Sequence, residues 1–223
     1  MNKKYAWIDI ETTGLDPEKE SILEVYVRIT DAQLKTIDEC HCLVKPPGGL
    51  EEATERMTPY VREMHEKNGL LKELQNAERT TTRPFTPFIV GEGLGLFLQL
   101  HNEGEPKSLY IAGSSVKFDW SFLEKHMPKV LEQVHYRCVD VSSTRVQMEM
   151  ITGEDWVYPK TKGHRAKEDI DDTIGEYQFL WDKFAQWVHD RGVLTDKGGL
   201  VKVTDHHASG SIKGVDLWGP LTA

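Results

Sequence analysis

The chain has 223 residues, of which 39% are hydrophobic and 28% are charged, and its formal net charge is −9. This length and composition are typical of one globular α/β domain with a sizeable core. The negative charge argues against a protein that tracks along a long polyanion, because such proteins normally carry a basic stripe. It leaves room for an enzyme that holds a short substrate through metal ions and a few donors.

The sequence contains no apolar run long enough to span a bilayer, and its first residues show no signal-peptide pattern. Its three cysteines cannot form a disulfide framework, which indicates a reducing environment. Cys40 and Cys42 flank His41 as in half of a zinc site, but no second half follows, so two strand residues on one face are the simpler interpretation. We therefore expect a cytoplasmic protein that does not associate with a membrane.

The first predicted element is a strand from residue 5 to residue 11. Alternation at period two puts its aliphatic residues on one face and Asp9 and Glu11 on the other. A strand this apolar is expected to be central and buried on both sides. Two neighbouring carboxylates repel each other unless a positive charge neutralises them, and a divalent metal held by oxygen ligands would do so. The alternative is an exposed strand end with two solvated acids.

Two more strands are predicted, at 21–30 and 36–45, and the short connection between them suits an antiparallel hairpin. Residues 51–75 are then predicted to be helical, in two pieces that break near Asn68 and Gly69. The chain therefore begins with three antiparallel strands followed by helices.

The second half alternates helices and strands: a helix that starts at the glycine-rich residues 91–95, a strand at 109–112, a helix at 117–125, a strand at 136–141, a helix at 143–151 with Ser142 as its N-cap, and a helix at 167–190 with one apolar stripe. The order predicts an α/β fold with a mixed sheet, in which parallel strands are added to the three antiparallel ones and helices cover both faces. Residues 1–190 would form one domain, and 191–223 a C-terminal extension of unknown role.

Two further acids stand out by their context. Asp119 follows a short strand near the start of a helix, and Asp169 lies in the first turn of the long helix, where either acid could simply meet the helix dipole. His164 precedes Asp169 by five residues, which would put the side chains about 140° apart on a continuous helix, so His164 is better placed in the loop before it. A lone loop histidine is usually just exposed, but beside four acids it is a candidate general base.

Together these residues resemble the catalytic set of the DEDDh exonuclease superfamily, which has the ribonuclease-H-like fold. Within it the chain is most similar to oligoribonuclease, over about residues 5 to 185. The matching stretches are Trp7 to Glu18, Met64-His65 with Asn68-Gly69-Leu70, Met127-Pro128, His135-Tyr136-Arg137 with Asp140-Val141-Ser142, and His164-Arg165-Ala166 with Asp169-Ile170. Tyr60 departs from the pattern, because the family has a tryptophan there, and so do the loop at 80–87 and the tail.

The resemblance implies a 3′–5′ exoribonuclease that degrades short oligoribonucleotides to 5′-mononucleotides with two divalent ions, Mg²⁺ or Mn²⁺. Asp9, Glu11 and Asp169 would hold one ion, while Asp9 and Asp119 would serve the second. His164 would take a proton from the attacking water.

The resemblance also implies contacts with short single-stranded RNA, or with DNA. Leu15 would wedge beside the terminal bases and Tyr60 would stack on a base, although ordinary packing is the alternative for both. The other implied contacts are Thr12, then His65 and Ser115 at the sugar or 3′ end, and Tyr136, Arg137, Ser142 and Thr144 around the 5′ phosphate, supplied by the partner subunit of an isologous homodimer.

Two other functions remain open. One is a DEDDh exonuclease acting on longer single-stranded DNA or RNA, as in proofreading or 3′-end trimming, against which the acidic balance argues. The other is a non-catalytic nucleic-acid-binding or interaction module, against which the presence of all five catalytic positions argues. His206 and His207 in the tail could bind a metal, although a solvated turn is the simpler interpretation.

Overall fold

A computed structural model of the chain describes residues 3–79, 84–102, 104–161 and 163–190. Met1–Asp182 forms one compact unit, and a second begins at Lys183. The predicted extension at 191–223, with His206 and His207, lies outside the described residues, so the proposed domain boundary after residue 190 stays a prediction. Within the described residues, no helix combines the length and apolarity needed to cross a bilayer.

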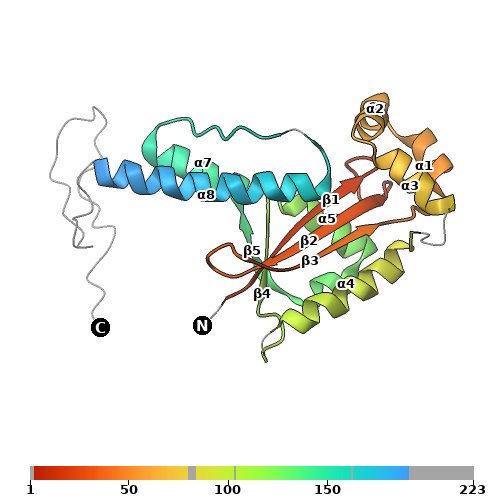
Figure 1. Cartoon of the computed structure of the whole chain (residues 1–223), viewed down its shortest axis with the longest axis horizontal. Helices are drawn as coiled ribbons and strands as arrows, with labels where there is room; N and C mark the ends of the chain where they lie inside the picture. Colours follow the sequence, from red (N-terminus) through yellow and green to blue (C-terminus); the bar gives the residue numbers. More distant parts are fainter. Residues whose placement is uncertain (1–2, 80–83, 103, 162, 191–223) are drawn as a thin grey trace. The chain divides into compact units, whose positions relative to one another are not determined.

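The described residues form a five-stranded sheet in the order β3-β2-β1-β4-β5 (Figure 1). Its strands are β1 (Tyr5–Thr12), β2 (Ile22–Thr30), β3 (Thr36–Leu43), β4 (Leu109–Gly113) and β5 (Val134–Asp140). The pairs β1–β2 and β2–β3 are antiparallel, whereas β1–β4 and β4–β5 are parallel. The predicted mixed sheet is confirmed, and β1 is its central strand, with Trp7 and Ile8 on opposite faces and each only 1% exposed.

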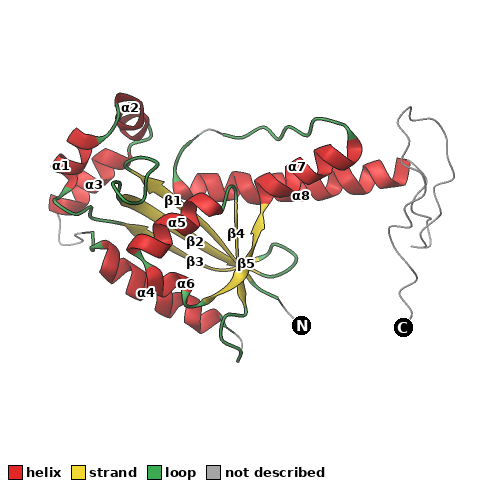
Figure 2. Ribbon diagram, turned by 180° about the vertical axis from the view of Figure 1, so that it is seen from behind, coloured by secondary structure: helices red, strands yellow, loops and turns green. Residues whose placement is uncertain are grey.

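Helices cover both faces of the sheet, as predicted. On one face lie α4 (Pro87–His101), α5 (Lys117–His126) and α6 (Pro128–Leu131), seen in front of the strands in Figure 2. Their apolar side chains share one core with Ile8 and Ile10 of β1. On the other face the first part of α8 (Ala166–Asp190) packs through Tyr177, whose ring lies edge-on to Trp7 with the centroids 5.7 Å apart.

Three short helices lie beside the end of β1: α1 (Leu50–Arg56), α2 (Pro59–Lys67) and α3 (Leu70–Arg79). They share a small core of their own with Leu23 of β2. The predicted break at Asn68 and Gly69 is confirmed, and Gly69 has a left-handed φ of +82°. A second break at Met57 and Thr58 was not predicted. It precedes Pro59, whose ring disfavours helical geometry in the residue before it.

The glycine-rich segment does not start a helix, contrary to prediction. α4 begins at Pro87, so Gly91 and Gly95 lie inside it. A Cβ atom on Gly91 would lie 3.0 Å from the Cβ of Met127, and one on Gly95 would lie 3.1 Å from the carbonyl oxygen of Lys129. The glycines therefore permit the close approach of α4 to Met127 and to α6.

The predicted N-cap of α7 (Val141–Thr152) is also wrong by two residues. Asp140 caps the helix, because its carboxylate accepts a hydrogen bond from the backbone N–H of Ser143 at 3.1 Å. Ser142 instead donates its hydroxyl to Asp140 at 2.6 Å. An aspartate at the end of β5 therefore opens the helix, and this aspartate recurs in the site described next.

Candidate active site

Asp9 and Glu11 occupy the last part of the central strand, next to the β-bulge between Glu11 and Thr12. Asp169 approaches them from the first turn of α8, where its backbone N–H donates to the carbonyl oxygen of Arg165 at 2.9 Å. One carboxylate oxygen from each of Asp9, Glu11 and Asp169 lies within 4.8 Å of the others. The structure therefore brings together three of the acids selected from the sequence, as a cluster with the spacing of a metal site.

Asp119 reaches the same strand from the helices on the opposite face. β4 pairs with β1 only as far as Trp7, which leaves the next backbone N–H groups along that edge without a strand partner. The carboxylate of Asp119, in the first turn of α5, accepts a hydrogen bond from the N–H of Ile10 at 3.2 Å. Asp119 is only 4% exposed, and its hydrogen bond to Ile10 holds the carboxylate at the strand residue between Asp9 and Glu11.

Burial raises the pKa of all four carboxyl groups, and repulsion from the other acids of the cluster adds to it for Asp9 and Glu11. Burial is the largest cause in each case, and it raises the pKa of Glu11 to about 9 and that of Asp119 to about 8. The pKa of Asp9 is raised well above its ordinary value by burial and then by Asp119 and Glu11, and the pKa of Asp169 is raised by burial. Without a cation this cluster resists full ionisation. A donor set made only of carboxylate oxygens is the kind that Mg²⁺ or Mn²⁺ prefers, so the residues fit such an ion.

His164 lies in the loop directly before α8, where the sequence placed it. Its side chain is exposed and its backbone φ of +48° is left-handed. It lies close enough to Asp169 for its charge to oppose the rise in the pKa of that carboxyl. The exposed imidazole is therefore beside the carboxylate cluster and open to solvent.

Thr12 and His65 join the end of β1 to α2. His65 is fully buried, and its Nε2 atom lies 2.9 Å from the carbonyl oxygen of Thr12. Its Nδ1 atom has no hydrogen-bond partner and lies 4.0 Å from the Oε2 atom of Glu11. Burial lowers the pKa of His65, which favours the neutral ring. A buried imidazole with an unpartnered ring nitrogen therefore borders the acidic cluster.

Leu15 and Tyr60 are both exposed, at 82% and 71% respectively. Leu15 follows the end of β1, and Tyr60 lies in the first turn of α2. Ordinary packing, the alternative interpretation of both residues, is therefore wrong. Two apolar surfaces are left open on segments next to the cluster.

Ser115, Ser142 and Thr144 converge on Asp140. The Oγ atoms of Ser115 and Ser142 are 3.3 Å apart, and Asp140 accepts hydrogen bonds from the N–H groups of Ser115 and Val116 at 3.3 and 3.0 Å. Thr144 donates its hydroxyl to the Asp140 carbonyl oxygen at 2.9 Å. Asp140 thus ties the start of α7 to the turn that leads into α5. Sequence reasoning assigned it no role, although an acid before two serines is typical of a helix cap.

Tyr136 and Arg137 are separated from the acids of β1 by a strand of the sheet. They lie on β5, the edge strand, which β4 separates from β1. The guanidinium of Arg137 stacks over the ring of Tyr136 at 5.0 Å, and Tyr136 is 72% exposed.

Comparison with known proteins gives concordant results. The model of a family described as exonuclease matches residues 6–177. The chain is 34% identical over 183 residues to the mitochondrial oligoribonuclease of Mus musculus, covering 80% of this chain and 72% of that protein. It is also 34% identical over 185 residues to the oligoribonuclease of Tropheryma whipplei, covering 80% and 92%. Because the mouse protein is described as mitochondrial, the expected cytoplasmic location stays a prediction.

The solved structures show the same fold. Exonuclease I of E. coli, in a complex with a 5cy-dA13 oligonucleotide, superposes with a TM-score of 0.57 at 12% identity. The match covers 86% of this chain but only 46% of that one, so this chain spans less than half of that enzyme.

The raised pKa values predict how the stability of the metal-free protein depends on pH. An aspartate in the unfolded chain has a pKa of about 4, whereas burial raises that of Asp119 to about 8. Between these values the unfolded chain releases a proton that the folded protein retains, so the free energy of unfolding falls as pH rises. Asp119→Asn can still accept from Ile10 but does not titrate. We expect it to stabilise the EDTA-treated protein, more at pH 8 than at pH 5, in urea unfolding.

Glu55→Gln is the matched control, because it changes the net charge equally at an exposed residue of α1. Added Mn²⁺ or Mg²⁺ should stabilise the original protein and reduce its difference from Asp119→Asn. An Asp119→Asn effect of equal size at both pH values would contradict the prediction.

Proposed function

The chain belongs to the exonuclease family, and on that basis we propose that it is a 3′–5′ exoribonuclease that hydrolyses short oligoribonucleotides to 5′-mononucleotides. The observation that carries the proposal is the cluster of Asp9, Glu11 and Asp169 beside Asp119 and His164. The identity to oligoribonucleases of two distant organisms supports the choice of RNA and of short substrates.

The enzyme uses divalent metal, and we assign two ions to it, either Mg²⁺ or Mn²⁺. Asp9, Glu11 and Asp169 would hold one ion, and Asp9 with Asp119 would serve the other. Bound divalent ions supply positive charge that stabilises the attacking and leaving oxygens of phosphodiester hydrolysis. The raised pKa values of the four carboxyls are consistent with this assignment, because a cation favours the ionised form of each.

The protein side chains orient the water and the substrate. The exposed imidazole of His164 would accept a proton from the attacking water and release it to solvent. Leu15 would wedge beside the terminal bases, and Tyr60 would stack on one, since an exposed aromatic ring stacks with any unpaired base. Ser115 would meet the sugar or 3′ end and Thr12 would line the same end, whereas His65 is fully buried and would support that end through its contact with the Thr12 carbonyl.

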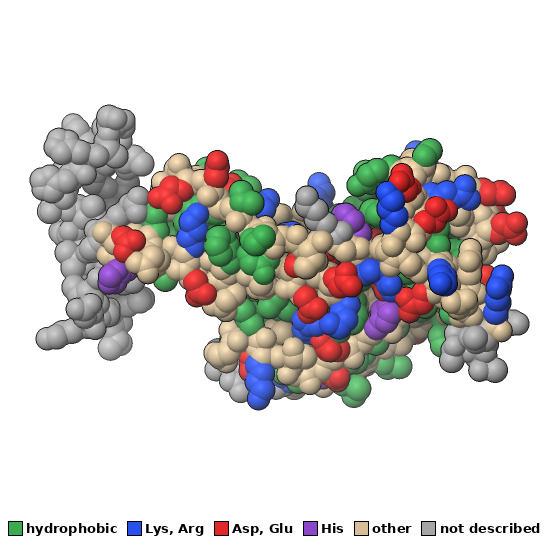
Figure 3. Space-filling model, turned by 45° about the horizontal axis from the view of Figure 1, so that its top comes forward, with side chains coloured by type: hydrophobic (Ala, Val, Ile, Leu, Met, Phe, Trp, Pro, Cys, Tyr) green, Lys and Arg blue, Asp and Glu red, His purple; other side chains and the backbone are tan. Residues whose placement is uncertain are grey.

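Charge favours short substrates over long ones. The chain carries a net charge of −9, and on the face drawn in Figure 3 the lysine and arginine side chains are interspersed with acidic ones and form no continuous stripe. A long strand would need several phosphate contacts in a row. Exonuclease activity on longer DNA or RNA is the second candidate, for which the fold of exonuclease I gives a precedent.

We also propose that the enzyme is an isologous homodimer. Large apolar side chains are exposed along β5 and α7: Tyr136 is 72% exposed, Met150 80% and Ile151 61%. This surface begins beside Arg137, Ser142 and Thr144, the residues that would close around the 5′ phosphate of the partner's substrate. A second copy would cover the apolar side chains and deliver these polar ones to the partner.

The first test of the function is substrate length. The enzyme would be incubated with Mn²⁺ or Mg²⁺ and 5′-labelled RNA of two, seven and about twenty-five nucleotides, beside matched DNA, with Asp119→Ala as the inactive control. We expect the shortest RNA to disappear fastest, because a short anion needs few basic contacts. Faster loss of long strands or of DNA would favour the second candidate. No metal-dependent turnover would overturn the proposal in favour of a non-catalytic module.

The mechanism predicts unequal losses from two substitutions. His164→Ala should lower kcat on the shortest RNA by about 10²–10⁴-fold and leave measurable activity, because a general base contributes about that much. Asp9→Ala should abolish turnover, because it removes an acid assigned to both ions. An unchanged rate in His164→Ala would refute the assignment of His164 as the base.

The dimer is tested by Met150→Glu on α7. Sedimentation equilibrium of the original protein should give twice the 25.5 kDa mass of one chain. The variant should dissociate because a charge is buried at the interface, and it should lose activity on the shortest RNA. Leu100→Glu is the control, since Leu100 is 83% exposed on α4, away from the proposed interface. A monomeric original protein with full activity would contradict the dimer.

A further inference from the structure

The backbone of His164 adopts a conformation that is uncommon for residues other than glycine. Its φ of +48° is in the left-handed region, which few residues other than glycine adopt. Such a conformation persists where the surrounding structure holds it in place. The contacts on each side of His164 show what holds it.

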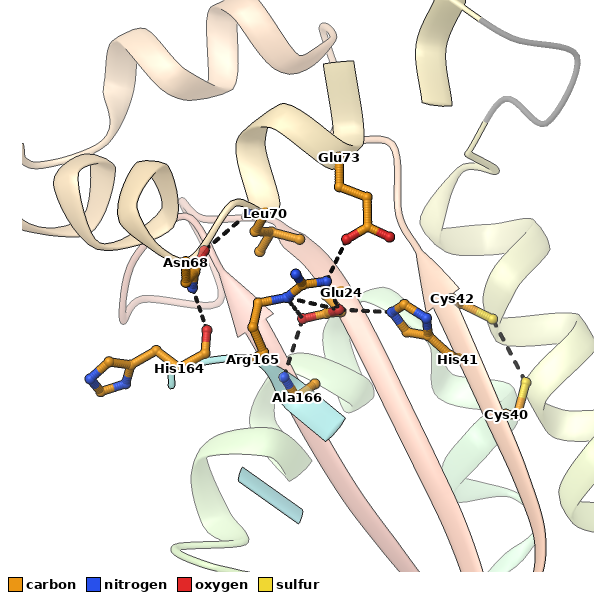
Figure 4. A network of polar contacts seen from close by, with 10 residues as sticks. All are labelled: Glu24, Cys40, His41, Cys42, Asn68, Leu70, Glu73, His164, Arg165 and Ala166. Carbon is orange, nitrogen blue, oxygen red and sulfur yellow. Dashed lines mark hydrogen bonds and ion pairs between the residues drawn. The ribbon is translucent and has the colours of Figure 1, made fainter. Parts of the chain in front are cut away.

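On the C-terminal side, Arg165 and Ala166 are both bound by Glu24 of β2 (Figure 4). The Arg165 guanidinium donates through Nε to both Glu24 oxygens, at 3.3 and 3.1 Å, and through Nη2 to Oε1 at 2.7 Å. The Ala166 backbone N–H donates to Oε2 of Glu24 at 3.2 Å. The Glu24 side chain is only 2% exposed, so both residues are anchored to the sheet, at the position opposite Glu11.

The ion pair is extended by two further groups. Arg165 Nη2 also lies 2.6 Å from Oε2 of Glu73 on α3, and His41 of β3 lies 2.7 Å from Oε1 of Glu24. The arginine thus has two carboxylate partners from two different elements. Its planar fork can meet both at once, which the point charge of a lysine cannot reproduce.

Asn68 holds the carbonyl group of His164 itself. Its amide Nδ2 donates to the His164 carbonyl oxygen, while its Oδ1 atom accepts from the Leu70 backbone N–H at 3.0 Å. Asn68 therefore ties the junction of α2 and α3 to the His164 loop. In Figure 4 the His164 carbonyl points toward Asn68, and the imidazole points away from the Arg165 network.

The loop is also pinned upstream of His164. The backbone and hydroxyl of Thr161 donate to Asp172 at 2.7 and 2.8 Å, and Lys160 lies 2.7 Å from Glu176. Asp172 and Glu176 are buried residues of α8. The imidazole is therefore presented from a segment whose backbone is hydrogen-bonded to Glu24 of β2, to Asn68 between α2 and α3, and to Asp172 of α8.

We propose that Asn68 and Arg165 are positioning residues, which act through His164 by holding its backbone so that the imidazole lies over the carboxylate cluster, with Glu24 and Glu73 fixing Arg165. This inference rests on the proposed function, in which His164 is the general base. It assigns a role to the polar junction between α2 and α3 that lies outside the acids and the base themselves.

One competing role must be separated from this one. The Arg165 carbonyl accepts the first backbone hydrogen bond of α8, from Asp169, so Arg165 could instead orient that acid. A loss that acts through Asp169 would change the metal concentration needed for activity and would persist when His164 is absent. A loss that acts through His164 would do neither.

Two conservative substitutions isolate the contacts. Arg165→Lys keeps the charge but loses the paired fork. Asn68→Asp keeps the acceptor for Leu70 but replaces the donor to the His164 carbonyl with an oxygen. Arg28→Lys is the control for the first, because Arg28 is likewise held by two carboxylates, Glu39 and Asp171.

Asn102→Asp is the control for the second substitution. The Asn102 side chain accepts from the Ser108 backbone N–H at 2.9 Å and donates to the Gln133 carbonyl oxygen at 2.9 Å, which reproduces the pattern of Asn68 at the end of α4. Each variant would be made in the original chain and in His164→Ala. Thermal unfolding would verify that it folds, and kcat, KM and the Mn²⁺ midpoint would be measured on the shortest RNA that is cleaved.

We expect Arg165→Lys and Asn68→Asp to lower kcat about tenfold or more in the original chain, because small displacements of a catalytic group are costly. KM and the Mn²⁺ midpoint should stay within about twofold, and in the His164→Ala background the effect on kcat should shrink to within about twofold. The two control variants should leave kcat unchanged. If Arg165→Lys does not fold, Asn68→Asp carries the test.

The inference is overturned if the losses of kcat are the same with and without His164, if the Mn²⁺ midpoint shifts instead, or if the variants behave like their controls. These outcomes differ from a failure of the proposed function. In that case the original chain would not cleave short RNA, or His164→Ala alone would retain the full rate.

Discussion

The strongest constraint on the structure is the burial of four carboxyl groups at one end of its central strand. Burial raises the pKa of Glu11 to about 9 and that of Asp119 to about 8, so the folded protein resists ionising these groups without a cation. The core of the sheet must therefore be stable enough to hold the cluster together. A bound cation would favour the ionised form of these buried groups, and this links their burial to the proposed function.

The sheet and the helices on each of its faces all supply the cluster. β1 contributes two acids because it lies at the centre of the sheet, while α5 and α8 each contribute an acid from the first turn, one on either face. An acid in the first turn also interacts favourably with the helix dipole, which offsets part of its burial. Arg165 places a guanidinium beside this acidic end and opposes the rise in the pKa of Glu11. The acids of the site and the Arg165 guanidinium thus lie in one region of the molecule.

Local patterns in the sequence were enough to predict much of the fold. Alternation in β1 predicted the central strand and the face on which Asp9 and Glu11 lie, and the apolar stripe predicted the helix α8. The errors arose where a single contact outweighs local pattern. Gly91 lies within a helix because another segment approaches it closely, and Asp140, rather than Ser142, caps α7 because its carboxylate reaches the Ser143 N–H.

The sequence by itself determined the residue types of the site, the strand and helix ends on which they lie, and the resemblance to exonucleases, because these depend on spacing along the chain. Tertiary structure alone decided which groups meet. Arg165 lies 141 residues from Glu24, and Asn68 lies 96 residues from His164. Sequence periodicity describes only neighbours within a few turns. Contacts at such separations follow from sheet register and helix packing, which bring distant segments together only when the whole domain folds.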